Sequence, residues 1–158
     1  MSAKIAKRNR PRERLGERNG TVGRFHVDIE LANNQDMVLA ESGHLDPNKV
    51  RRARVPAVVD TGAVSLVLPK AVVERLGVPQ VGTVKVRYAD QRRAKRDKVK
   101  NVWVKVLGRE EIFSAIVEPK RQDALLGAVV LEQLDLMVAP VSQKLVPRDP
   151  SGIIAEIE

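Results

Sequence analysis

Hydrophobic and polar residues alternate with a period of two along much of the chain from residue 21 onward. The stretch TVGRFHVDIEL, residues 21–31, places Phe25, Val27, Ile29 and Leu31 on alternate positions. Successive side chains of a strand point to opposite faces, so this pattern is typical of a strand with one buried face. A strand is therefore predicted over this segment.

Further strands are predicted by the same alternation, or by short apolar runs between turn residues. These segments are 50–60, 65–69, 82–90, 97–108, 111–118 and the beginning and end of 123–140. A polar tip joins the third and fourth segments, which predicts a projecting hairpin. Residues 33–49 contain Asn, Gly and Pro around a short apolar piece and are predicted to form a loop or hairpin.

Two short helices interrupt this series of strands. Val72, Val73 and Leu76 have helical spacing, and Gly77 follows them as a stop signal. A second short helix is predicted after Gly127, before the chain returns to a strand at 136–138. The chain of 158 residues is thus predicted to be one mainly β domain with one or two short helices.

The last eight residues, SGIIAEIE, could form an edge strand. The isoleucines of this tail would need a partner to cover them. At the other end, residues 1–20 lack hydrophobic periodicity and are predicted to be a flexible basic extension, with the folded domain spanning 21–158.

The net charge of +8 is concentrated in residues 1–20 and 85–100. Such tracts can bind nucleic acid or an acidic surface, or can simply be solvated. Nucleic acid is not favoured, because no nucleic-acid-binding motif accompanies the charge. The basic extension itself could direct localisation, be removed by self-cleavage, or be inert.

The composition also limits the chemistry. There is no cysteine and there are two histidines, so neither a disulfide framework nor a structural zinc site is expected, and no metal or organic cofactor is predicted. No apolar run approaches the roughly 18 residues of a membrane span. No apolar segment follows the basic start, which argues against a secretory signal, and a cytoplasmic location is predicted.

One polar interruption stands out in the apolar run 55–69: Asp60, Thr61 and Gly62. A carboxylate can activate water as a general base, and two carboxylates held close together share one proton, so that one acts as base and the other as acid. The Thr61 hydroxyl can donate and accept hydrogen bonds at once. Gly62 allows a sharp turn and a close approach to the backbone.

The Asp60 carboxylate also fits a purely structural role. It could merely cap a turn, since Asp-Thr-Gly suits turns. Asp90 or Asp135 could supply a second carboxylate within the chain, although each fits a solvated or capping position better.

A Ser-His-Asp hydrolase could in principle combine His26 or His44 with Ser65 or Ser114, but the chain contains no GxSxG elbow. Trp103 is interpreted as strand packing. Tyr88 is interpreted in the same way, although at the base of a lid it could touch a substrate.

The sequences VVDTGA and, further on, ALLGAVVLEQLDL resemble the retroviral-type, single-lobe (retropepsin-like) aspartic proteases, and more closely their bacterial relatives. The resemblance runs roughly from residue 22 to residue 147. It includes the strand that enters the loop, the Asp-Thr-Gly-Ala turn and a hairpin in the place of the flap. It also includes a hydrophobic-hydrophobic-Gly turn, formed by Leu125, Leu126 and Gly127, with its following helix.

The resemblance implies a closed, mostly β barrel whose active site forms only in a homodimer. Asp60 would be the catalytic aspartate and would meet its own copy across a twofold axis. Thr61 would make an interlocking contact across that axis, Gly62 would supply backbone contacts to a peptide, and Ala63 would support the loop with them. The isoleucine-rich tail would form a strand of an intersubunit sheet.

The resemblance also assigns the two remaining parts of the site. The hairpin around residues 88–98 would close over the substrate as a flap, and its contact residues would be Tyr88, Ala89, Asp90 and Gln91. The second turn would contribute Leu126, Gly127 and Ala128.

Two departures from the family pattern are visible. Retroviral members carry an acidic residue after Asp-Thr-Gly-Ala and an arginine after the later glycine, whereas Val64 and Ala128 stand here, which is consistent with an apolar contact replacing an ion pair. The predicted flap tip lacks glycine and is basic, which suggests a different opening motion and raises the hypothesis of acidic substrates.

The sequence therefore predicts an aspartic endopeptidase that hydrolyses polypeptides as a homodimer. The alternative function is a peptide- or anion-binding module on the same fold, without turnover.

Overall fold

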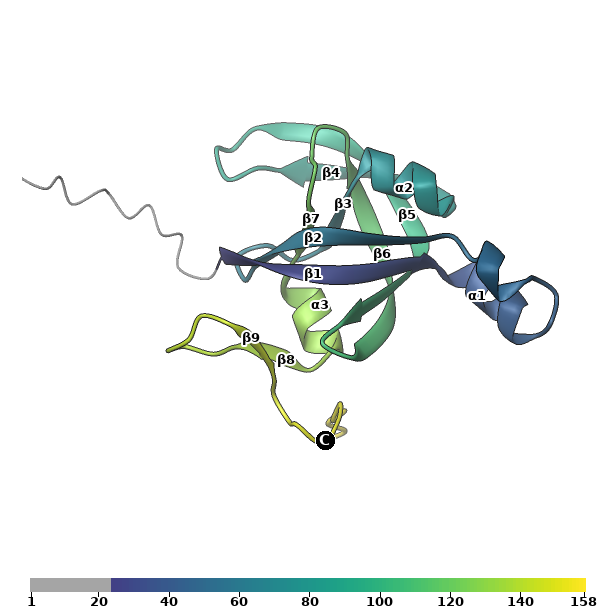
Figure 1. Cartoon of the computed structure of the whole chain (residues 1–158). Helices are drawn as coiled ribbons and strands as arrows, with labels where there is room; N and C mark the ends of the chain where they lie inside the picture. Colours follow the sequence, from purple (N-terminus) through teal and green to yellow (C-terminus); the bar gives the residue numbers. More distant parts are fainter. Residues whose placement is uncertain (1–23) are drawn as a thin grey trace, which may run out of the picture.

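The computed structural model describes residues 24–158 (Figure 1). The predicted basic extension lies outside this range. The elements follow in the order β1 (Arg24–Asn33), α1 (Asn34–Glu41), the 3-10 helix η1 (Pro47–Lys49), β2 (Arg52–Asp60), β3 (Leu66–Pro69), α2 (Lys70–Leu76), β4 (Gln80–Arg87), β5 (Arg93–Val106), β6 (Arg109–Glu118), β7 (Ala124–Leu126), α3 (Ala128–Gln133), β8 (Leu136–Val138) and β9 (Leu145–Pro147).

Six strands close into a barrel. The strand order is β1-β2-β7-β3-β6-β5-β4, and β1 also pairs with β5, the sixth strand of the series, which closes the ring. The closing contact runs from Glu30, opposite Lys105, to Asn33, opposite Val102. Strand β4 pairs only with β5 and therefore stands outside the closed ring as an edge strand. The prediction of a closed, mainly β fold is confirmed.

The barrel interior is aliphatic, as expected from a chain with few aromatic residues. The alternating residues of β1 predicted to face the core, Ile29 and Leu31, are fully buried. They pack in one cluster with Val59 at the end of β2 and with Leu66 and Leu126 on the neighbouring strands. Burial of this apolar surface supplies the main driving force for folding.

Strands β4 and β5 form the predicted hairpin, with Arg87 directly opposite Arg93. The tip is shorter than predicted, because β5 begins at Arg93 rather than near residue 97. In Figure 1 the tip of this hairpin and the turn between β2 and β3 lie on the same side of the molecule, at the left.

The segment 33–49 was wrongly predicted to be a loop or hairpin, since α1 occupies most of it. The Asn33 side chain caps the helix by accepting a hydrogen bond from the Asp36 backbone N–H at 3.1 Å. Its side-chain nitrogen donates to the Leu76 carbonyl at the end of α2, at 2.9 Å. The asparagines that suggested a turn in the sequence thus begin a helix. With α2 and α3 the described residues contain three short α-helices, more than the one or two predicted.

An ion pair between the buried Asp36 and the half-exposed Arg51 anchors α1 to the barrel. Asp36 is 7% exposed and accepts hydrogen bonds from the Arg51 backbone N–H and guanidinium at 2.8 to 3.0 Å. The Arg51 guanidinium lies against Gly77, which adopts a left-handed φ of 63° at the end of α2. A Cβ atom there would lie 2.0 Å from an Arg51 nitrogen, which would have to shift, and the left-handed turn itself favours glycine.

The predicted helices after residue 70 and after Gly127 are confirmed as α2 and α3. Strand β9, which pairs with β8, was not predicted. Residues 151–158 contain no strand within the single chain, contrary to the edge strand considered for this tail. Among the helices of residues 24–158, none combines the length and apolar character needed to cross a membrane.

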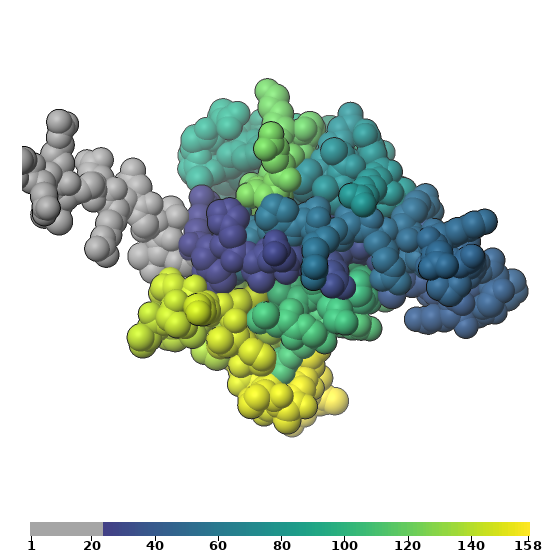
Figure 2. Space-filling model, viewed as in Figure 1, coloured from purple at the N-terminus to yellow at the C-terminus, as the bar shows by residue number. Residues whose placement is uncertain are grey.

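The C-terminal segment packs beneath the barrel, as Figure 2 shows in yellow. Arg109, on β6, donates to the carbonyls of Leu134 at 3.1 Å and of Asp135 at 2.7 Å, and also to that of Asp149. The Asp135 carboxylate accepts a hydrogen bond from the Ile154 backbone at 3.3 Å. These contacts fix the start of the tail, while Ile153, Ile154 and Ile157 are 45%, 54% and 88% exposed.

Candidate active site

Asp60 is the last residue of β2, at the point where the chain leaves the barrel wall. Its side chain is only 13% exposed. The backbone N–H of Gly62 donates to Oδ1 at 2.9 Å, and the Arg24 guanidinium donates to Oδ2 from Nε at 3.0 Å and from a terminal nitrogen at 2.8 Å. Both carboxylate oxygens therefore have a hydrogen-bond partner in the single chain.

The next residues form a tight turn. The Ala63 backbone N–H donates to the Asp60 carbonyl at 3.1 Å. Thr61 and Gly62 are exposed, and Ala63 is half-buried. The Thr61 hydroxyl makes no hydrogen bond to any other described residue. The turn thus presents Thr61 and Gly62 at the surface beside the Asp60 carboxylate.

The second turn clamps this loop through main-chain hydrogen bonds. Strand β7 lies between β2 and β3 and brings Gly127 to the loop. The backbone N–H groups of Gly127, Ala128 and Val129 donate to the carbonyls of Ser65 at 3.1 Å, Ala63 at 2.8 Å and Val64 at 3.0 Å. The structure thus brings the predicted second turn to the predicted active-site loop.

Gly127 has no room for a side chain. A Cβ atom at this position would lie 2.4 Å from the Val64 carbonyl carbon and 2.6 Å from the Ser65 oxygen. Both are backbone atoms, which cannot move aside without opening the loop. The close approach of the two loops therefore depends on glycine at position 127.

An apolar contact was expected where retroviral relatives have an acid–arginine pair. The Val64 side chain is instead 66% exposed in the single chain. Main-chain hydrogen bonds to Ala128 and Val129 join the two loops, so no side-chain pair is needed to hold them together.

The four predicted flap residues, 88–91, lie in the turn between β4 and β5. The Tyr88 backbone N–H donates to the Arg92 carbonyl at 2.8 Å, and the Gln91 N–H donates back to the Tyr88 carbonyl at 2.9 Å. Gln91 has a left-handed φ of 69°. Asp90 pairs with Arg92 at 2.6 Å, which lowers the pKa of the Asp90 carboxyl through their side-chain hydrogen bond. Ala89 is exposed.

Glu118, at the end of β6, fixes the base of this turn. The Tyr88 hydroxyl donates to one Glu118 oxygen at 2.6 Å, and Arg96 Nε donates to the other at 3.0 Å. The hydrogen bond to this carboxylate, with burial, raises the pKa of the Tyr88 phenol. The guanidinium carbons of Arg92 and Arg96 lie 5.0 Å and 5.9 Å from the centre of the Tyr88 ring. The hairpin is therefore tied to the barrel by one side-chain cluster.

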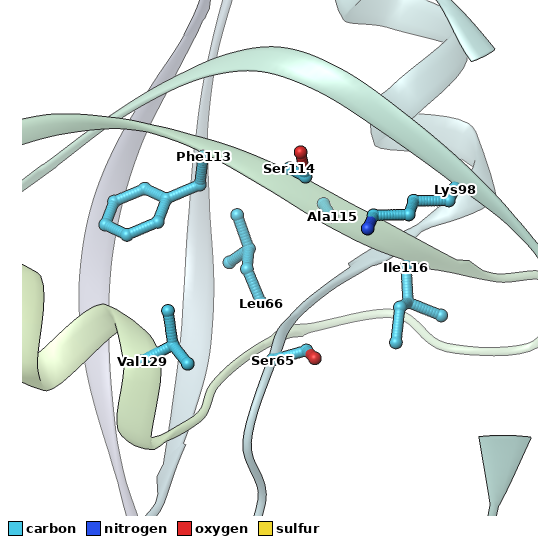
Figure 3. A pocket seen from close by; sticks show the side chains of 8 residues that line it. All are labelled: Ser65, Leu66, Lys98, Phe113, Ser114, Ala115, Ile116 and Val129. Atoms are coloured by element: carbon cyan, nitrogen blue, oxygen red, sulfur yellow. The ribbon is translucent and has the colours of Figure 1, made fainter. Parts of the chain in front are cut away.

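A pocket of about 190 Å³ opens next to the clamp (Figure 3). Ser65 lines it from the loop after Asp60, Val129 from α3, Phe113 and Ser114 from β6, and Lys98 from β5. Its wall is mostly apolar, with one exposed ammonium and two hydroxyl groups. No histidine lines it, so the pocket lacks the base of a Ser-His-Asp hydrolase.

The competing carboxylates and histidines have other partners. Asp135 pairs with Arg148 at 3.2 Å, and Asp90 pairs with Arg92. His26 lies 3.6 Å from Asp123, and His44 lies 3.0 Å from the Ser42 hydroxyl. The Ser-His-Asp arrangement is therefore not assembled.

Within residues 24–158, no group of three or more acidic or histidine side chains is positioned to hold a metal ion. Trp103 is 7% exposed and packs against α1, as predicted for a packing residue.

Arg24 and Glu118 are two site residues that were not predicted from the sequence. Arg24 lies opposite Asp60 only because β1 and β2 pair in this register. Glu118 is the polar residue that ends a predicted strand, which is too common a position to single it out.

A family model described as "gag-polyprotein putative aspartyl protease" matches residues 48–133, more than half of the chain. No curated protein matches the chain. Among solved structures, EIAV protease complexed with the inhibitor HBY-793 superposes with a TM-score of 0.51 at 16% sequence identity, covering 80% of this chain and 96% of that protein. This likeness shows the fold alone. The family match and the barrel together establish that the chain belongs to the gag-polyprotein aspartyl protease family and has the retropepsin-like fold that its Asp-Thr-Gly-Ala turn predicted.

Proposed function

We propose that the protein is an aspartic endopeptidase that hydrolyses polypeptides as a homodimer, with Asp60 as its catalytic residue. The observation that carries the proposal is the position of Asp60: a largely buried carboxylate at the end of β2, in a turn clamped by Gly127, within an aspartyl protease family. The Asp-Thr-Gly turn occurs once in the chain. A twofold axis beside the turn would bring Asp60 next to its copy from a second chain.

The two carboxylates would share one proton, because like charges a few ångströms apart cannot both ionise. The ionised group takes a proton from a water molecule, and that water attacks the peptide carbonyl. The protonated group stabilises the carbonyl oxygen, and a proton then reaches the departing amine. The pair titrates as a unit, so activity should be highest where it holds a single proton.

The neighbouring residues have supporting roles in this proposal. The exposed Thr61 hydroxyl would bond to the partner chain across the axis, and Gly62 and Ala63 would hold the loop and offer backbone groups to the peptide. The turn that contains Tyr88, Ala89, Asp90 and Gln91 would cover the substrate. Leu126, Gly127 and Ala128 would keep the catalytic loop in place.

Arg24 must leave Asp60 before the pair can form. Its side chain is 50% exposed, so it can turn into solvent when a second copy approaches. The isolated chain would be inactive because it has only one carboxylate of the pair. The exposed isoleucines of the tail would add an intersubunit sheet. The cytoplasmic location stays a prediction from the sequence.

The test is hydrolysis of a peptide library at several pH values, by the wild type and by Asp60→Asn, with the molecular mass in solution measured in parallel. Cleavage by a dimeric wild type and none by Asp60→Asn would support the proposal. Equal cleavage by both proteins, or a strict monomer at working concentrations, would contradict it.

A non-catalytic peptide- or anion-binding module is the second candidate. The Arg24–Asp60 pair favours it, since a carboxylate that is ion-paired with an arginine can serve structure alone. This function would be indicated by a wild type that binds peptides or anions but cleaves none of the library at any pH.

A further inference from the structure

The outer face of the β4–β5 hairpin carries four cations in two directly opposed pairs. Arg87 lies opposite Arg93, and Lys85 lies opposite Lys95. All four side chains are exposed. The alternate residues, including Val84, Val86 and Ala94, are half-buried on the opposite face. Thus one face of the hairpin packs toward the molecule and the other presents a two-by-two array of positive charge.

This arrangement is unfavourable for the hairpin itself. Like charges directly opposite each other on antiparallel strands destabilise the pairing. Within residues 24–158, no carboxylate lies within ion-pair distance of any of the four. By contrast, Arg92 is paired with Asp90 and Arg96 with Glu118 on the same hairpin. An anion from outside the described fold would relieve the repulsion.

Strand β4 also offers an unpaired backbone edge. Among residues 24–158 it is the last strand in the order and pairs only with β5, so no described strand pairs with its other edge, and only the Gly82 carbonyl accepts a side-chain hydrogen bond, from Gln80 at 3.3 Å. An extended polypeptide can add to such an edge, and its alternate side chains then lie about 6.6–6.8 Å apart on one face. That spacing matches Lys85 and Arg87, which are two residues apart on the edge strand itself.

The same features discriminate among partners. A segment with acidic residues at alternate positions would place its carboxylates beside Lys85 and Arg87, whereas a basic segment or a second copy of this edge would be repelled. A nucleic acid could use the charge but not the backbone edge, and no aromatic side chain stands among the four cations to stack with bases.

The geometry points to a docking site for an acidic, extended polypeptide segment along the outer edge of the β4–β5 hairpin. The segment adds as a strand to β4, and its alternate carboxylates pair with Lys85 and Arg87, with Arg93 and Lys95 behind them. The site is formed by the hairpin alone and does not depend on the peptidase activity.

Binding is measured by fluorescence anisotropy in the Asp60→Asn background, so that hydrolysis cannot remove the probe. The probe is a labelled peptide of alternating Glu and Thr. The comparison probes are its Lys-Thr counterpart, the Glu-Thr peptide with every second backbone nitrogen methylated, and a single-stranded oligonucleotide of equal charge. Each is titrated at about 50 mM and about 200 mM salt.

The Glu-Thr peptide should bind more tightly than every comparison probe. Lys85→Gln with Arg87→Gln should weaken its binding about tenfold, on the scale of two exposed charge pairs. Lys49→Gln with Lys70→Gln removes the same charge from exposed positions elsewhere and should change binding by less than about twofold.

Three results would overturn the proposal. Tighter binding of the oligonucleotide, with the same dependence on Lys85 and Arg87, would make the surface a nucleic-acid site. An equal loss of Glu-Thr peptide binding in both double variants would show that the binding depends only on the net charge of the protein. No binding of the Glu-Thr peptide at the lower salt concentration would mean that these cations only protect the edge against pairing with other strands.

Discussion

Arg24, the first residue of β1, holds Oδ2 of Asp60 at the end of β2, with its Nε 3.0 Å and a terminal nitrogen 2.8 Å from that oxygen. The Gly62 backbone N–H donates a hydrogen bond to the other carboxylate oxygen, Oδ1, at 2.9 Å. In the proposed dimer, association and exposure of the catalytic group are therefore one event, since the second Asp60 must replace the arginine.

Replacing Arg24 should consequently favour association. In the Arg24→Gln variant each chain loses a charge-assisted hydrogen bond worth roughly 1 kcal/mol, and a dimer breaks two of them, so the dimerisation constant should rise roughly 30-fold. Sedimentation equilibrium measures this change, and added salt should shift the wild type in the same direction. Weaker association of Arg24→Gln would show instead that the arginine helps to build the dimer.

The clamp at Gly127 predicts a steric effect on stability. In Gly127→Ala the new methyl group meets backbone atoms of Val64 and Ser65 at 2.4 to 2.6 Å, which should cost about 3 kcal/mol in the free energy of unfolding. Gly108→Ala gives the comparison, because nothing lies within 4 Å of a Cβ there and its cost of about 1 kcal/mol comes from the left-handed φ of 78° alone. Urea unfolding should rank Gly127→Ala well below Gly108→Ala, and equal stabilities would refute the clamp.

Tyr88 is the chain's only tyrosine, so its ionisation can be followed without interference. Its pKa is raised above the ordinary 10.0, chiefly by the hydrogen bond to Glu118. Absorbance titration of the phenol should therefore show a midpoint above 10.0 in the wild type and a lower one in Glu118→Gln.

The sign of the linked stability follows from this shift. The hydrogen-bonded Tyr88 phenol adds to the free energy of unfolding, and this stabilisation is fully present below pH 10.0, the pKa in the unfolded chain. It is lost as the pH rises through the higher pKa of the folded protein. Faster amide exchange in the hairpin should accompany Glu118→Gln if this residue positions the flap. An unchanged titration midpoint of Tyr88 in Glu118→Gln would show that Glu118 does not hold the Tyr88 hydroxyl.

The ion pair between Asp36 and Arg51 predicts acid sensitivity. The side-chain hydrogen bond from Arg51 holds the Asp36 pKa below its ordinary 3.8, so this stabilisation is present above pH 3.8 and is lost as the pH falls through the lower folded value. Asp36→Asn should cost about 1–3 kcal/mol near neutral pH and less in acid. The exposed Asp28, changed to Asn, should cost little at either pH.

The C-terminal isoleucines test the intersubunit sheet. Ile153, Ile154 and Ile157 are largely exposed in the single chain, so changing all three to Ser should leave the unfolding temperature of the monomer nearly unchanged. The same variant should dimerise more weakly, and its peptidase activity at low protein concentration should fall with the dimer. Undiminished association would exclude the tail from the interface.

The features that were predictable from the sequence are those fixed by local pattern. Alternation identified β1 and β2, and Gly77 marked the end of α2, because each depends on neighbours in the chain. Helix α1 was not predictable in this way: Val38 and Leu39 are 54% and 44% exposed, so its apolar residues do not form a buried stripe at helical spacing.

Contacts between segments far apart in the chain could not be predicted from the sequence pattern. Arg24 meets Asp60 across 36 positions, and Tyr88 meets Glu118 across 30, and both pairings depend on strand register in the closed barrel. Strand β9 has three residues, too few to show a period. The catalytic candidate could thus be located from sequence, whereas the groups that restrain it could not.

Because main-chain atoms alone join the two loops, the side chains of Val64 and Ala128 contribute nothing to these hydrogen bonds. Positions 64 and 128 are therefore free to diversify, by natural drift or in a randomised library, while the architecture around Asp60 persists. An engineer could vary residues immediately beside Asp60 without first having to rebuild the scaffold.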